Sequence, residues 1–296
     1  SEEHTSEARR SLESLLAHDF CPLETWGTIS LGAVTGRNSF FALTKTEVEQ
    51  LGLSRESLIP LCPPGSQHLR RLSFEKTDWE HLKDADKRSW LFWPNRIDAQ
   101  SLSQAERRYV EQGVSTKVST AYKCRNRSPW WRVPLTNKAD AFITYMNSFG
   151  PNICTNDADV YHLNSCHGIV FENRNRELGM GYLPLAALNS ATAFSAEIVG
   201  RSYGGGLLKL EPRESAHLAV PSADTVAGAC AELDSIRPRV VQDLERRDFE
   251  HASSLVDSVL LEGSLGMSRE ETDILAHAAA KLRARRMARG RKEKRP

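Results

Sequence analysis

The chain has 296 residues, of which 40% are hydrophobic and 26% are charged. These values are typical of a folded globular protein and exclude a disordered chain that is poor in apolar residues. The sequence has neither an apolar run long enough to cross a bilayer nor the basic and apolar start of a secretory signal, so we expect a cytoplasmic protein without a membrane partner. The six cysteines form no Cys-x-x-Cys pair, which argues against a zinc ribbon or a disulfide framework.

The formal net charge of +1 hides an uneven distribution of charge along the chain. Residues 281–296 contain nine basic residues and one acidic residue, so this tail carries +8 and the preceding 280 residues carry −7. A basic tail suggests contact with a polyanion or an acidic partner, and the alternative is a solvated helix end.

The first half of the chain mixes helical and strand patterns. Residues 5–18 have apolar side chains at helical spacing, which predicts an amphipathic lead-in helix. Two strand-like runs, 28–31 and 40–43, flank a turn with Gly36 and Asn38 and predict a hairpin. Ser103 and Glu106 form a capping-box pattern that opens a helix extending to residue 112.

The second half begins with strand patterns and ends with helical ones. Short apolar runs at 141–146, 161–163 and 168–171 predict strands, and an alanine-rich run predicts one helix over 183–199. From residue 223 onward every pattern is helical. We therefore predict an α+β fold with a lead-in helix over 1–20, a mixed, β-rich domain over 21–220 with a candidate division near 115, and a helical appendix with a basic tail over 221–296.

Known catalytic patterns are missing from the sequence. It contains no dinucleotide-binding glycine motif, Walker A loop, nucleophile elbow or His-Glu-x-x-His motif. Cys154, His162, Cys166 and His167 lie close in sequence, but their spacing matches no common structural zinc pattern. Packed thiols and hydrogen-bonded histidines are the favoured interpretation, and we predict no metal site.

One basic and aromatic segment favours nucleic-acid binding. Residues 117–132 contain five basic residues, three aromatic residues and no acidic residue. Clustered cations bind phosphates, and aromatic rings stack on bases or sugars. The alternative is that Trp130 and Trp131 belong to the core and that the cations are simply exposed.

Three further turns allow two interpretations each. The polar turns at 35–38 and 164–168 have side chains that suit phosphates or base edges, and both also suit ordinary connections. Gly204, Gly205 and Gly206 either end a helix or permit close approach of the backbone to a ligand.

Four stretches taken together, 31–43, 123–134, 161–168 and 200–212, resemble in this order the C-terminal region of adenine-N6 DNA methyltransferases of the restriction-modification type. In that family a catalytic domain precedes this region, binds S-adenosylmethionine and holds a flipped adenine with an Asn/Asp-Pro-Pro-Tyr/Phe motif. The Pro-Pro of this sequence, Cys62-Pro63-Pro64-Gly65, lacks both flanking residues of that motif. The resemblance thus implies a target-recognition domain without catalytic residues or a cofactor of its own, which grips double-stranded DNA while another subunit extrudes the base.

The resemblance also indicates which residues face DNA. Arginines are the preferred contacts to phosphate or guanine, because a guanidinium offers two parallel hydrogen bonds. The candidate DNA-binding residues are Thr35, Gly36, Arg37, Asn38, Lys123, Arg125, Asn126, Arg127, Trp130, Trp131, Arg132, Asn164, Ser165, His167, Arg201, Ser202, Tyr203 and Lys209.

The leading hypothesis is a sequence-specific DNA-binding subunit of a split adenine-N6 DNA methyltransferase in a restriction-modification or phage-defence system. Its partner would be a separate catalytic subunit that binds S-adenosylmethionine. One alternative is a metal-dependent nuclease that uses His162, Asn164 and His167. Another is a noncatalytic interaction protein of phage defence that uses the recognition fold as a scaffold.

Overall fold

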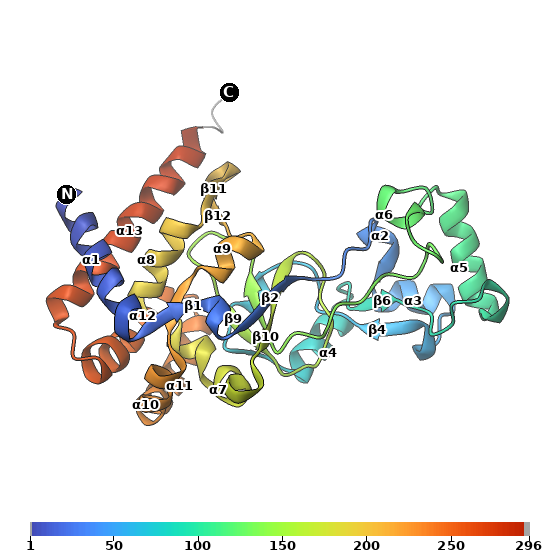
Figure 1. Cartoon of the computed structure of the whole chain (residues 1–296). Helices are drawn as coiled ribbons and strands as arrows, with labels where there is room; N and C mark the ends of the chain where they lie inside the picture. The colour runs from blue at the N-terminus through green and yellow to red at the C-terminus, as the bar shows by residue number, and fades with distance from the viewer. Residues whose placement is uncertain (1, 293–296) are drawn as a thin grey trace.

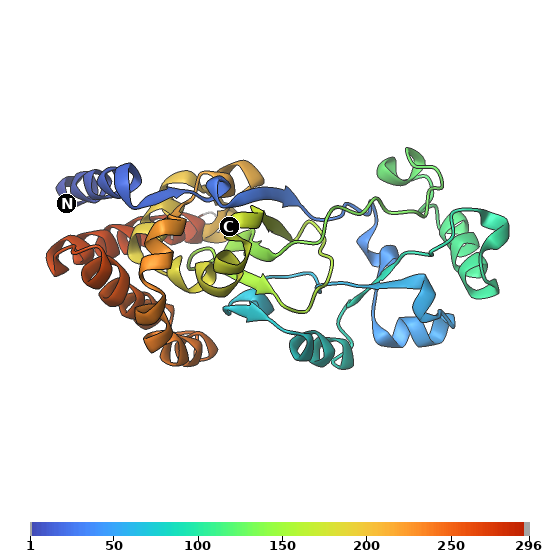
Figure 2. The ribbon, with the colours of Figure 1, turned by 60° about the horizontal axis from the view of Figure 1, so that its bottom comes forward.

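The computed structural model describes residues 2–292 and divides them into a large lobe and a small lobe joined by extended segments (Figure 1). The small lobe is formed by residues 33–61 and 90–135, whose apolar side chains make a hydrophobic core of their own. Figure 2 shows the helical end of the large lobe, the central sheet and the small lobe following one another along the long axis of the molecule.

The small lobe combines a short three-stranded sheet with four helices. Its sheet has the order β3–β6–β4, and both strand pairs are antiparallel. The capping box predicted at Ser103 is present, because the Ser103 hydroxyl accepts the Glu106 N–H and the Glu106 carboxylate accepts the Ser103 N–H. The elements are α2 (Asn38–Phe41), β3 (Ala42–Leu43), α3 (Lys45–Leu51), β4 (Leu58–Pro60), β6 (Trp90–Phe92), α5 (Gln104–Ser115) and α6 (Tyr122–Arg125).

A five-stranded sheet forms the centre of the large lobe and has the order β2–β10–β7–β9–β5. Only the β5–β9 pair of this sheet is parallel. Every residue of β7 and β9 is buried, as expected for inner strands covered on both faces. The strands are β2 (Gly27–Leu31), β5 (Ser73–Phe74), β7 (Ala141–Thr144), β9 (Ile153–Asn156) and β10 (Cys166–Phe171).

Helices and two small sheets complete the large lobe. Strand β1 (Phe20–Pro22) pairs with β13 (Ala219–Pro221), and the second sheet has the order β11–β12–β8 with β11 (Arg201–Tyr203), β12 (Leu207–Lys209) and β8 (Met146–Asn147). Ala8, Leu12 and Leu15 of α1 belong to one buried cluster with residues of α13, so the predicted lead-in helix is confirmed and docked. The helices are α1 (Glu2–His18), α4 (Lys76–Asp84), α7 (Arg176–Ala186), α8 (Ser190–Val199), α9 (Pro212–Ala216), α10 (Ala223–Gly228), α11 (Cys230–Glu245), α12 (Phe249–Val256), a π-helix η7 (Asp257–Ser264) and α13 (Arg269–Lys292).

The α+β class is confirmed, although helices make up more of the chain than the short strands do. Three local predictions are wrong. Residues 161–163 form no strand and contribute only isolated bridges, Leu163 with Ala33 and Tyr161 with Leu61. Residues 28–43 form no hairpin, because β2 pairs with β10 while β3 pairs with β6 in the other lobe. The run 183–199 contains two helices, because the buried Asn189 side chain accepts the Thr192 N–H at 2.8 Å and starts α8 afresh.

No helix within residues 2–292 is both long enough and apolar enough to span a membrane. The domain boundaries given from the sequence stay predictions. The core of the small lobe contains residues on both sides of position 115, among them Tyr109, Val110 and Val118.

Candidate nucleic-acid interface

The turn at residues 35–38 is fixed by its own side chains. The Thr35 hydroxyl donates to Asn38 Oδ1 at 2.5 Å and accepts the Arg37 N–H at 3.1 Å. Thr35 is buried, whereas Gly36, Arg37 and Asn38 are exposed. The turn therefore presents Arg37 to solvent on a rigid support.

Helix α6 lies directly against this turn. Gly36 has a φ of +84°, and a Cβ there would lie 2.8 Å from Cβ of Lys123. The Cys124 thiol points at the Thr35 carbonyl, with 3.6 Å between sulfur and oxygen. The structure thus brings together the turn at 35–38 and the basic segment that contains α6, which are far apart in the sequence.

An exposed tyrosine stands between two cations on α6. Tyr122 is 65% exposed, so most of its aromatic side chain faces solvent. Lys123 Nζ lies 5.7 Å from the centroid of its ring, and Arg125 Cζ lies 5.4 Å away. Tyr122 is not among the residues predicted from the sequence to bind DNA, because its exposure depends on the tertiary structure.

Arg127 and Arg132 have packing partners inside the small lobe. Arg127 donates to the Val34 carbonyl at 2.5 Å and lies over the Phe41 ring. Arg132 donates to the Pro94 carbonyl at 2.6 Å, with Cζ 3.5 Å from the Trp93 ring centroid. Desolvation lowers the pKa of both guanidinium groups, and the DNA contacts predicted for them stay predictions.

The tryptophans of the same segment pack into the small lobe. Trp131 is 8% exposed and belongs to the core. Trp130 is half-buried, with its ring centroid 5.7 Å from that of Phe40. Asn126 is exposed at the end of α6, where its amide donates to the Tyr122 carbonyl.

A second group of predicted residues lies in the large lobe on β11 and β12. Arg201, Ser202 and Tyr203 are all exposed. Arg201 pairs with Glu214 at 2.5 Å, and Lys209 pairs with Glu211 at 2.6 Å. Lys209 Nζ also lies 5.2 Å from the Tyr203 ring centroid, so β11 presents an aromatic ring beside a cation, as α6 does.

The glycine turn between β11 and β12 receives the end of α13. Gly206 has a φ of +81°, and a Cβ there would lie 2.9 Å from Met287 Cα. A Cβ on Gly290 would lie 2.1 Å from the Gly206 nitrogen. The glycines therefore permit close packing of this helix, which accounts for them without the ligand contact that was one of their two interpretations.

The third predicted turn is only partly at the surface. Asn164 is exposed and Ser165 half-buried, but His167 is fully buried in β10 with Nε2 2.6 Å from the Leu210 carbonyl oxygen. Desolvation lowers the pKa of His167, and it lowers that of the buried His162 to about 4. In this structure neither imidazole is open to a DNA strand, which weakens the nuclease hypothesis.

The described residues also contain no group of three His, Cys, Asp or Glu side chains that could hold a metal ion. Cys154 and Cys166 are buried free thiols, and burial raises the pKa of each.

The two exposed groups lie on the same side of the molecule. In Figure 1, α6 of the small lobe and β11 of the large lobe both rise on the upper side, and β2, at the edge of the large lobe's sheet, lies lower in the view. The basic end of α13 stands next to β11 in the same view. We call the upper face between α6 and β11 the saddle.

Comparison with known proteins places the chain in a family. It matches the model of the C-terminal domain of the Type II methyltransferase M.Eco57I over residues 4–261. The chain belongs to this family of methyltransferase C-terminal domains, which confirms the resemblance seen in the sequence.

Individual relatives agree with this assignment. The chain is 25% identical over 203 residues to the Type II methyltransferase M.AccI of Acinetobacter calcoaceticus, a match that covers 68% of this chain and 36% of that protein. It is 29% identical over 151 residues to the Type II methyltransferase M.XamI of Xanthomonas campestris pv. amaranthicola, which covers 49% of this chain and 28% of that protein. The matches thus span about a third of each relative's length.

One similar solved structure is that of the type IIG restriction endonuclease BpuSI. It aligns with 98% of this chain and 34% of its own length, with a TM-score of 0.48 and 13% sequence identity.

Proposed function

We propose that this chain grips double-stranded DNA in its saddle as the target-recognition part of a Type II adenine-N6 DNA methyltransferase system. The observation that carries the proposal is the exposed pair Lys123 and Arg125 at the Tyr122 ring, together with Arg37 on the turn that packs against the same helix. No carboxylate pairs with any of these three cations in residues 4–290, whose side chains the structure describes. Unpaired cations beside an exposed ring suit phosphates and stacked bases.

The second arm of the saddle supports the same proposal. Arg201 and Tyr203 are exposed on β11, and Arg285 and Arg289 are exposed on the neighbouring end of α13. A duplex that contacts both arms would be held at two separate places along its length. Phosphate contacts of this kind fix the register of a protein on DNA, and side chains between them read base edges.

The finer proposal concerns chemistry and partner. The sequence has no Asn/Asp-Pro-Pro-Tyr/Phe motif, so we assign the methyl transfer to a catalytic subunit that binds S-adenosylmethionine. In this arrangement the present chain selects the site and the catalytic subunit holds the extruded adenine. DNA as the target implies work in the cytoplasm.

The DNA-binding proposal is tested by fluorescence anisotropy with a labelled duplex. We expect the triple variant Arg37→Ala, Lys123→Ala, Arg125→Ala to bind at least about tenfold more weakly than the wild type. The matched control removes three exposed cations elsewhere, Lys76, Arg239 and Arg246. Failure of the wild type to bind any duplex at low salt would reject the proposal and favour a noncatalytic interaction protein.

The methylation proposal requires a second experiment. The chain is mixed with a candidate methyltransferase subunit, S-adenosylmethionine carrying a labelled methyl group, and plasmid DNA. We expect label to enter adenine at one site only when both proteins are present. Equal methylation with and without this chain would reject the split arrangement while leaving DNA binding intact.

A further inference from the structure

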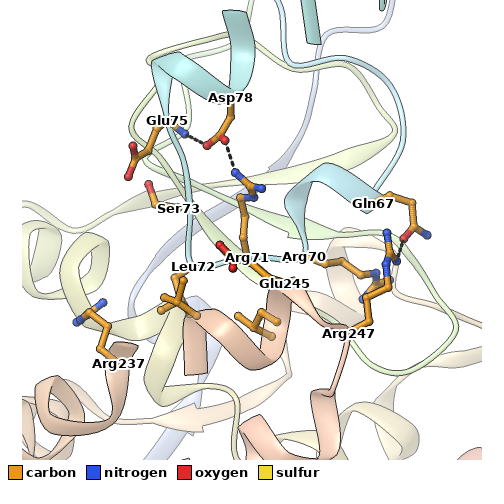
Figure 3. A pocket seen from close by; sticks show the side chains of 12 residues that line it. Gln67, Arg70, Arg71, Leu72, Ser73, Glu75, Asp78, Arg237, Glu245 and Arg247 are labelled. Carbon is orange, nitrogen blue, oxygen red and sulfur yellow. Dashed lines mark hydrogen bonds and ion pairs between the residues drawn. The ribbon is translucent and has the colours of Figure 1, made fainter. Parts of the chain in front are cut away.

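A cleft lies between α11, α4 and the 3-10 helix η3 (Gln67–Leu69) and has a volume of about 440 Å³ (Figure 3). In Figure 1, α4 and α11 lie on the lower side of the large lobe, away from the saddle. Four of the residues that line the cleft are arginines: Arg70, Arg71, Arg237 and Arg247.

Arg70 is a buried cation whose partners are all neutral. Arg70 is only 8% exposed. It donates to the Gly150 carbonyl at 2.8 Å, to Asn147 Oδ1 at 2.9 Å and, more weakly, to the Met146 carbonyl at 3.4 Å. Buried charges in proteins usually have a charged partner, because neutral hydrogen bonds offset only part of the lost hydration.

A second cation with a neutral partner stands beside Arg70. Figure 3 shows the guanidinium groups of Arg70 and Arg247 side by side. Arg247 donates to Gln67 Oε1 at 2.5 Å and occupies a left-handed backbone conformation with φ of +61° at the end of α11. Burial, and then the nearby charge of Arg247, lower the pKa of Arg70 to about 10.

The other two arginines of the cleft each have a carboxylate partner. Arg71 pairs with Asp78, and Arg237 pairs with Asp234 at 3.2 Å. Among the described side chains, those of residues 4–290, no ion pair involves Arg70 or Arg247. The uncompensated positive charge of the cleft is therefore concentrated between these two side chains.

We propose that this cleft binds a phosphorylated small molecule of about the size of a mononucleotide, with its phosphate between Arg70 and Arg247. Two guanidinium groups match the oxygens of a phosphate and would gain the charge partner that they lack. The volume lies within the usual range of small-molecule sites.

The rest of the lining favours a small ligand over a nucleic-acid strand. Glu75 and Glu245 line the same cleft, and their carboxylates would repel a long polyanion but accept hydrogen bonds from hydroxyl or amino groups. Leu72 and Val241 add apolar surface, and Val241 is 38% exposed where a base or sugar could cover it.

Isothermal titration calorimetry of the full chain with adenosine 5′-monophosphate tests this site. We expect a Kd below about 1 mM, weaker binding of inorganic phosphate, and no measurable binding of adenosine. Arg247→Gln, at an exposed position, should weaken binding by about tenfold. Arg70→Lys should weaken it similarly, and Arg246→Gln, the neighbouring exposed arginine, should leave it unchanged.

Four results would overturn the proposal. The first three are the absence of nucleotide binding, equal binding of adenosine, and equal effects of Arg247→Gln and Arg246→Gln. The fourth is displacement of the nucleotide by duplex DNA, because it would assign the cleft to the DNA-binding face. DNA binding by the saddle can succeed or fail independently of each result.

Discussion

Arginines of the small lobe differ in what their guanidinium groups contact. Arg127 and Arg132 donate to backbone carbonyls and lie over aromatic rings, so they stabilise the lobe. Arg37 and Arg125 remain exposed and lack carboxylate partners in the described chain. The guanidinium groups of Arg37 and Arg125 are therefore free to contact phosphates, and the Tyr122 ring lies beside that of Arg125.

Replacement of Tyr122 tests whether this ring contacts DNA. We expect Tyr122→Ala to weaken duplex binding by about tenfold, because an aromatic side chain that stacks on a base contributes roughly 1–3 kcal/mol. Tyr122→Phe keeps the ring and should bind within about twofold of the wild type. Both variants should unfold at the wild-type temperature, since the side chain is exposed; equal binding by the alanine variant would exclude the contact.

Asp257 gives the chain a pH-dependent stability. Its carboxylate is 4% exposed and accepts the Ser190 N–H at 2.7 Å and the Ser190 hydroxyl at 2.5 Å. Desolvation raises the pKa of Asp257 from 3.8 to about 7 despite these hydrogen bonds. The folded state therefore binds this proton more tightly than the unfolded state, and the resulting stabilisation is lost as pH rises from about 4 to 7.

The prediction is measured by urea unfolding at several pH values. Between about pH 4 and pH 7, deprotonation of Asp257 should lower the free energy of unfolding of the wild type by an amount on the order of a few kcal/mol. Asp257→Asn removes the titrating group, so its curve should be flatter over this range. Parallel curves for the two proteins would show that Asp257 titrates normally.

The sequence could identify which residues carry charge near the saddle, but not which of these charges are already used. In the sequence, Lys123, Arg125 and Arg127 are equivalent cations of one basic segment. Only the tertiary structure shows that Arg127 already binds a backbone carbonyl, while Lys123 and Arg125 are exposed. The burial of His167 was equally hidden, because its neighbours Asn164 and Ser165 are polar.

At the scale of elements, local signals predicted helices well and strand pairing poorly. The predicted Ser103–Glu106 capping box forms, because its interactions span only three residues. The structure has a second such box at Ser268 and Glu271. The hairpin predicted over 28–43 does not form, because β2 pairs with β10, more than a hundred residues away in the sequence. Tertiary neighbours decide such pairings, and a single sequence does not reveal them.

Helix α13 packs against the β11–β12 turn, and one buried ion pair lies at this contact. Arg286 and Glu197 side chains are 5% and 6% exposed and lie 2.7 Å apart. Arg286 also donates to the carbonyls of Gly206 and Ser148. This pair links α13, α8 and the saddle's second arm.

Arg286→Met should destabilise the fold by about 3–5 kcal/mol, because it leaves the buried Glu197 carboxylate without a partner. Adding Glu197→Leu should recover much of that loss, since an apolar pair of similar volume replaces the ion pair. Chemical unfolding of the single and double variants measures both effects. A double variant that is as unstable as the single one would contradict this account of the contact.

At the scale of the whole molecule, the two lobes hold separate hydrophobic cores, and the elements α6 and β11, which carry exposed cations, rise on one side. The formal charge of +1 conceals this arrangement, because cations on the saddle are balanced by acidic residues elsewhere. Association with DNA responds to the local surface charge more than to the total charge.

The salt dependence of duplex binding tests this account most directly. For the wild type, log Kd should rise steeply with log salt concentration, and the slope should fall by roughly 0.9 for each phosphate contact removed. The variant Arg37→Ala, Lys123→Ala, Arg125→Ala should therefore lose about 2–3 units of slope, while the Lys76, Arg239 and Arg246 control keeps the wild-type slope. Equal slopes for all three proteins would contradict the claim that the saddle holds DNA.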